Sequence, residues 1–191
     1  MITMEDSYTA IIFAIQEIDC SLNSDIIETK FLKPDNEDSM CKVKVIVTLR
    51  EKPSYILTSK TDAIPKPVNC VEFYINVPFG YPVVKPHVYF RHDSFLAHVN
   101  TFRNGDQCTD EWGPYCSLLT LIEKTVKAII YDPVVALPNA PANSNLVEWQ
   151  AAKTRSREFP LFPPEHIYAR YKKLRALPSN MVRGKRPLPN R

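Results

Sequence analysis

Apolar and polar residues alternate along two stretches of the chain, residues 43–49 and 71–77, and each stretch predicts a half-buried β-strand. The apolar positions are Val43, Val45, Val47, Leu49, Val71, Phe73, Ile75 and Val77. Shorter patterns predict two more strands at residues 27–32 and 87–90. Turn residues, many of them prolines, separate the four segments. Four strands joined in this way predict an antiparallel meander.

Apolar residues at helical spacing predict helices on both sides of these strands. Residues 5–18 carry a broad apolar stripe typical of an amphipathic helix. Thr120 and Glu123 match a capping box and predict the start of a second helix. Shorter helices are expected at residues 144–153 and from Pro163 onward. The order of helix, four strands and later helices predicts the α+β fold class.

The segment between the last strand and the second helix, residues 92–115, has no clean period and predicts a long loop, a feature that is often functional. It carries Asn100 eight residues before Cys108. A cysteine thiolate can take an acyl group and release it, and an amide can hydrogen-bond the oxyanion that forms. Acidic neighbours of Cys108 disfavour its thiolate, which suits a thiol charged by a partner enzyme better than a protease cysteine.

Other roles for these residues remain open from the sequence. His98 and Cys108 are candidates for a Cys–His dyad, and together with Cys116 for a metal site. However, the chain has no C-x-x-C motif, and a spacing of eight between the two cysteines matches no common zinc framework. With four glycines there is no glycine-rich phosphate loop. We therefore expect no metal and no cofactor. A further interpretation of Cys108 is a structural one, because a lone cysteine is often a small buried apolar residue.

Composition predicts one domain with a C-terminal extension. The chain has 191 residues, of which 45% are hydrophobic and 24% charged, and we place the domain at residues 1–155 and the extension at 156–191. Five scattered cysteines, an odd number, predict a reducing compartment. No apolar run has transmembrane length, and the N-terminus lacks the features of a secretory signal. We therefore expect a cytoplasmic protein.

Charge is distributed unevenly along the chain. The net charge is +3, but residues 155–191 hold ten Lys or Arg and two Asp or Glu, which leaves fourteen basic and nineteen acidic residues in the rest. A basic, proline-containing segment can dock an acidic partner or nucleic acid. A solvated extension is an equally good interpretation.

Five short motifs follow one another in a fixed order. They are Tyr81-Pro82-x-x-x-Pro86-x-Val88-x-Phe90, His98-Val99-Asn100, Cys108-Thr109-Asp110, Trp112-Gly113-Pro114 and, at the expected helix end, Asp132-Pro133. In order and spacing they resemble the Tyr-Pro-x-x-x-Pro-x-Val-x-Phe, His-Pro-Asn, Cys-Leu-Asp, Trp-x-Pro and Asp-Pro motifs of ubiquitin-conjugating enzymes. The resemblance covers residues 5–155 and implies the ubiquitin-conjugating fold.

The resemblance also implies a mechanism without a cofactor. Cys108 would accept the C-terminus of a ubiquitin-like protein from an activating enzyme as a thioester, and an amine on an acceptor protein would then attack it. Asn100 would stabilise the oxyanion or hold the loop, and Asp110 would orient the amine. His98 and Trp112 would support the active loop. We expect neither a membrane nor nucleic acid among the partners.

The chain departs from the family pattern in three places. Val99 replaces a proline, the segment from Cys108 to Trp112 is short, and the loop after Pro133 lacks the family's usual acidic residue. Asn139 is a candidate to act on the acceptor side in its place. This divergence resembles the bacterial conjugating enzymes of antiphage defence operons, some of which carry a cyclic-oligonucleotide synthase by its C-terminus. Two rival functions are a non-catalytic binding module of the same fold and an adaptor that acts through the basic tail.

Overall fold

The computed structural model describes residues 3–59, 61, 64–109, 112, 113, 115–132 and 141–159. The helices are α1 (Met4–Ser21), α2 (Leu118–Ile129) and α3 (Val147–Arg155), the last preceded by a 3₁₀ turn (Ser144–Leu146). The strands are β1 (Ile27–Leu32), β2 (Ser39–Thr48), β3 (Ser54–Leu57), β4 (Lys66–Val68), β5 (Cys70–Pro78), β6 (His87–Phe90) and β7 (Phe95–Leu96). In the described part of the chain, no helix is long and apolar enough to cross a membrane.

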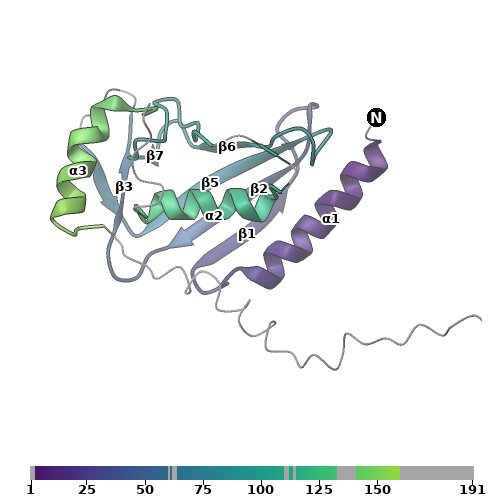
Figure 1. Ribbon diagram of the computed structural model, residues 1–191, viewed down its shortest axis with the longest axis horizontal. Helices are drawn as coiled ribbons and strands as arrows, with labels where there is room; N and C mark the ends of the chain where they lie inside the picture. Colours follow the sequence, from purple (N-terminus) through teal and green to yellow (C-terminus); the bar gives the residue numbers. More distant parts are fainter. Residues whose placement is uncertain are drawn as a thin grey trace, which may run out of the picture.

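The main sheet has the strand order β1-β2-β5-β6, and every neighbouring pair is antiparallel. Its inner face is built from the alternating apolar residues of β2, β5 and β6, which are almost fully buried. The amphipathic helix α2 crosses this face, and α1 lies along the side of the sheet (Figure 1). The predicted α+β class, with an N-terminal helix, a four-stranded antiparallel meander and later helices, is confirmed.

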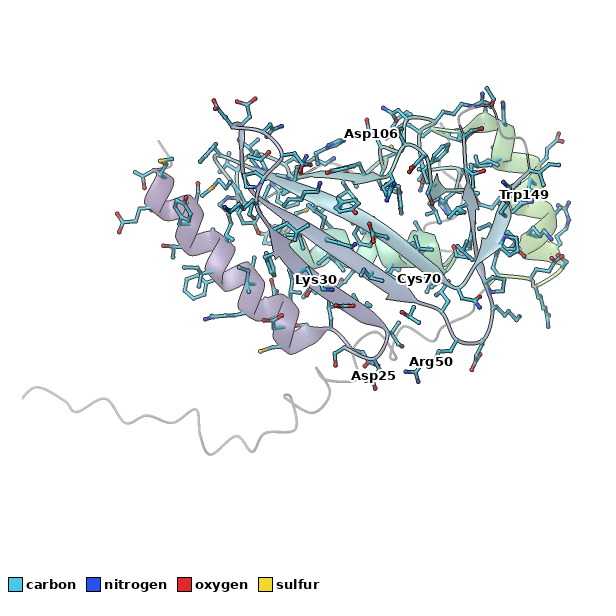
Figure 2. All side chains as sticks on the ribbon, turned by 180° about the vertical axis from the view of Figure 1, so that it is seen from behind. Asp25, Lys30, Arg50, Cys70, Asp106 and Trp149 are labelled. Atoms are coloured by element: carbon cyan, nitrogen blue, oxygen red, sulfur yellow. The ribbon has the colours of Figure 1, made fainter. Side chains whose placement is uncertain are left out.

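None of the helices that the structure describes covers the opposite face of the main sheet (Figure 2). It carries polar and charged side chains, including Lys30 on β1 and Glu72 on β5. Several of these form ion pairs with neighbours on the same face, for example Lys30 with Glu28 and Lys44 with Glu72. The two faces of the sheet therefore follow directly from the period-two pattern of the sequence.

A second, smaller sheet was not predicted from the sequence. It has the order β4-β3-β7 and joins residues of the connection between β2 and β5 to the start of the segment expected to be a loop. The expectation of a loop from residue 92 is wrong for Phe95 and Leu96, which form β7 and are fully buried. Strands of two to four residues are too short to show a period, and Pro67 within β4 suggested a turn.

Helix α2 begins earlier than the sequence pattern predicted. Its N-cap is Ser117, whose hydroxyl accepts the backbone N–H of Thr120 at 3.2 Å, while the Thr120 hydroxyl accepts the backbone N–H of Ser117 at 3.3 Å. The predicted box of Thr120 and Glu123 is therefore wrong, because Thr120 is the third residue of the helix and not its cap. The earlier start buries Leu118 and Leu119 in the core.

An aromatic cluster closes the end of the domain beside α3. Tyr55, Tyr131, Trp149 and Phe159 pack ring against ring, with the centroids of Tyr131 and Phe159 3.6 Å apart. The Tyr131 hydroxyl donates to the carbonyl of Ala97 at 2.8 Å. The cluster thus connects β3, the end of α2 and α3 to the first residues of the candidate active loop.

Candidate active site

Cys108 and Asn100 face each other at the base of a small hairpin. The backbone N–H of Cys108 donates to the carbonyl of Asn100 at 2.7 Å. Immediately above this bond, Thr101 and Gln107 form an antiparallel bridge, and the Thr101 hydroxyl donates to the Gln107 amide oxygen at 3.0 Å. A separation of eight residues in the sequence therefore becomes direct backbone contact.

The hairpin is fixed to the edge of the main sheet through β6. Gln107 N–H donates to the carbonyl of Val88 at 2.9 Å, and Phe90 N–H donates to the carbonyl of Gly105 at 2.8 Å. Gly105 has a φ of +94°, and a Cβ at this position would lie 2.6 Å from the carbonyl oxygen of Phe90. Only glycine fits this turn without moving the strand.

We expect Gly105→Ala to destabilise the protein by at least about 2 kcal/mol, because it adds both backbone strain and a clash with Phe90. Urea unfolding followed by circular dichroism measures the change. Gly113→Ala is the matched control: among the described residues, no atom lies within 4 Å of a Cβ there, so its effect should stay within about 0.5 kcal/mol. Equal losses in the two variants would contradict this account of the turn.

His98 lies beneath the hairpin and is completely buried. Its Nδ1 accepts the backbone N–H of Asn100 at 3.1 Å, and its ring packs 5.3 Å from that of Tyr131. Burial lowers the pKa of His98 to about 3, so the ring is neutral near pH 7. This environment does not suit the thiolate–imidazolium pair of a Cys–His dyad. It places His98 where a residue that braces the loop would lie.

Val99 occupies the position where the ubiquitin-conjugating motif has proline, and its backbone N–H forms a hydrogen bond. It donates to the amide oxygen of Gln150, a buried residue of α3, at 3.1 Å. The carbonyl of Val99 accepts the backbone N–H of Asn143 at 3.0 Å. Proline has no N–H and would leave the Gln150 oxygen without this donor. The loop therefore gains from α3 part of the restraint that a proline ring would supply.

The side chain of Cys108 is exposed, while the backbone on both sides of it is held. After Cys108, the carbonyl of Thr109 accepts a hydrogen bond from Lys85 Nζ at 2.9 Å. Farther on, Trp112 Nε1 donates to the carbonyl of Pro82 at 2.6 Å, and its ring packs 6.2 Å from that of Tyr81. Two side-chain bonds thus tie the segment after Cys108 to the turn between β5 and β6.

The structure brings Asn100, Cys108 and His98 together and places Trp112 next to the β5–β6 turn. Asp110 and Asn139 lie outside the described residues, so their roles stay predictions.

Sequence reasoning missed Lys85 and Gln150. Lys85 stood only as a variable position in the Tyr81–Phe90 motif, and Gln150 as a polar residue of a short helix; neither carries a local signal of its contact. Within the described ranges, no group of three or more His, Cys, Asp or Glu could hold a metal ion.

Comparisons with known proteins find a similarity of structure. No protein-family model matches this chain, and no curated protein matches it. Among solved structures, it is similar to human ubiquitin-conjugating enzyme E2 G1, with a TM-score of 0.45 and 14% sequence identity. The match covers 68% of this chain and 98% of that chain.

Proposed function

We propose that this protein is an acyl-carrier transferase of the ubiquitin-conjugating type, with Cys108 as its nucleophile. The observation that carries the proposal is the exposed thiol of Cys108, fixed through its backbone beside Asn100 on a loop that is otherwise bonded and partly buried. A carrier of this kind must present its thiol to large protein partners, and so it needs exposure more than a deep substrate pocket. An exposed side chain on an ordered backbone fits that need.

The reaction has two acyl transfers. First, the Cys108 thiolate attacks the thioester that links the carrier's C-terminus to the activating enzyme; a new C–S bond forms, and the enzyme's sulfur leaves as a thiolate. Then the acceptor amine attacks the carbonyl on Cys108, an amide C–N bond forms, the C–S bond breaks and the amine loses a proton. Each step passes through an oxyanion that needs hydrogen-bond donors.

Asn100 is our candidate donor for this oxyanion. The backbone N–H of Cys108 already donates to the carbonyl of Asn100, so it is not the donor to the oxyanion. The Asn100 side chain carries two amide N–H groups and begins at the residue paired with Cys108. Removing one such donor in acyl-transfer enzymes costs about a hundredfold to a thousandfold in rate.

The remaining roles belong to the same proposal. His98 and Trp112 support the loop, Asp110 orients the incoming amine and Asn139 acts on the acceptor side. The partners are an activating enzyme, a carried protein and an acceptor protein. The carried protein is a ubiquitin-like protein or, as in some bacterial antiphage systems, a cyclic-oligonucleotide synthase. We place this work in the cytoplasm, where a free thiol persists.

Charging of the full chain tests the proposal. The chain is incubated with ATP, an activating enzyme and a carrier, using ubiquitin with its own activating enzyme and the candidates encoded beside this gene. We expect an adduct that thiol reagents remove and that mass spectrometry maps to Cys108. Cys20 and Cys70 are also exposed, so they serve as internal controls. Adducts spread over all three cysteines would contradict the proposal.

A further inference from the structure

Lys85 lies closer to the proposed nucleophile than its place in the sequence suggests. It is half-buried at the end of the turn between β5 and β6, directly before the buried Pro86. The turn itself is fixed, because the backbone N–H groups of Val83 and Val84 both donate to the carbonyl of Gly80 at 2.9 Å. From this position the Lys85 amine reaches the carbonyl of Thr109, the residue after Cys108, at 2.9 Å.

This contact limits the separation between the amine and the thiol. Seven covalent bonds join Cys108 Sγ to the Thr109 carbonyl oxygen, which corresponds to at most about 9 Å when fully extended. Adding the hydrogen bond of 2.9 Å, Lys85 Nζ lies within about 12 Å of Sγ whatever the torsion angles. The Lys85 side chain has four rotatable bonds, so a change of its torsion angles can carry the amine toward an acyl group on Sγ.

We propose that Lys85 is an acceptor in cis: the acyl group carried by Cys108 moves to the amine of Lys85 in the same molecule. This inference rests on the proposed function, because it needs the thioester on Cys108. The neutral amine attacks the thioester carbonyl, an amide C–N bond forms and the C–S bond breaks. Cys108 leaves as a thiolate, and the amine proton passes to water. The product is an acylated Lys85 with a free Cys108.

Proximity is the reason why we expect transfer to Lys85 and not to another lysine. An amine held near the reacting carbonyl acts at an effective concentration far above that of a lysine in solution. Lysines on the far strands of the main sheet lack this proximity. Lys30, for example, lies on β1, the edge strand opposite to β6, so three strand spacings, or about 14 Å, separate its strand from the one that holds the hairpin. Figure 2 shows Lys30 across the sheet from Asp106, a residue of that hairpin.

The test uses a chemical acyl donor in place of the partner enzymes. The full chain with Cys20→Ser and Cys70→Ser is incubated with a short peptide that ends in a glycine thioester of mercaptoethanesulfonate. Tryptic peptides are analysed by mass spectrometry before and after dithiothreitol. We expect a dithiothreitol-sensitive acyl group on Cys108 and, with time, a resistant one on Lys85. Cys108→Ala should reduce Lys85 acylation at least about tenfold, because transfer then loses its intramolecular donor.

Two lysine variants complete the experiment. Lys85→Arg keeps the positive charge but should lose the resistant adduct and retain the thioester, whereas Lys30→Arg should change neither. Acylated Cys108 without transfer to Lys85 overturns this inference and leaves the proposed function standing. Lys85 acylation at an equal rate in Cys108→Ala also overturns it, because the peptide then reacts with the lysine directly. No acylation of Cys108 overturns both the inference and the proposed function.

Discussion

The substitution Cys108→Ala should reduce charging of this chain to background, a loss of at least about a thousandfold, as expected when a covalent nucleophile is removed. The thiol is exposed, and the hydrogen bonds at Cys108 and Thr109 are made by their backbone atoms. Alanine keeps both. We therefore expect the free energy of unfolding to change by no more than about 0.5 kcal/mol, so the loss would be one of chemistry and not of folding.

Matched variants separate this effect from general thiol reactivity. Cys70→Ala removes another exposed thiol, on β5, and should leave charging intact. Cys108→Ser should give an oxygen ester with the carried protein, which thiol reagents do not cleave readily. Normal charging by Cys108→Ala, measured on non-reducing gels, would eliminate Cys108 as the carrier.

The sequence predicted the main sheet because its strands are half-buried and long enough to show a period. The apolar positions of the pattern in β2 and β5 are buried, and β1 and β6 have the predicted bounds. The small sheet was missed because β7 has only two residues, both buried, and so has no alternation to read. Periodicity reports a contrast between two faces, and a fully buried short strand has none.

The candidate site could be predicted only in part, and the reason differs from that for the small sheet. Asn100 and Cys108 were paired by the order of the motifs, and the hairpin places them in contact. The contacts of Lys85 with Thr109 and of Gln150 with Val99 join residues 24 and 51 positions apart. Each depends on how one side chain reaches another segment's backbone, which local patterns do not encode. Such contacts emerge only once the elements are packed.

Acid should destabilise this protein partly through His98. In the unfolded chain a histidine has a pKa of about 6.5, whereas burial lowers the pKa of His98 to about 3 in the folded protein. Between these values the unfolded state binds a proton that the folded state does not, so stability falls as the pH falls. From pH 7 to pH 4.5 we expect a loss of about 2 to 3 kcal/mol from this group. The loss should reach about 4 kcal/mol near pH 3 and be nearly absent above pH 7.

The variant His98→Asn isolates this contribution. Its Oδ1 can accept the backbone N–H of Asn100 in place of Nδ1, but the side chain does not titrate. Loss of the ring contact with Tyr131 should make it less stable than the wild type at pH 7. Carboxylates whose pKa is lowered in the folded state, such as Asp35 and Glu72, also destabilise the protein in acid. Their contribution to the free energy of unfolding is the same in both proteins and cancels in the difference. In urea titrations from pH 7 to pH 4.5, the gap between the two proteins should therefore narrow by about 2 to 3 kcal/mol. A constant gap would mean that His98 takes up its proton without unfolding.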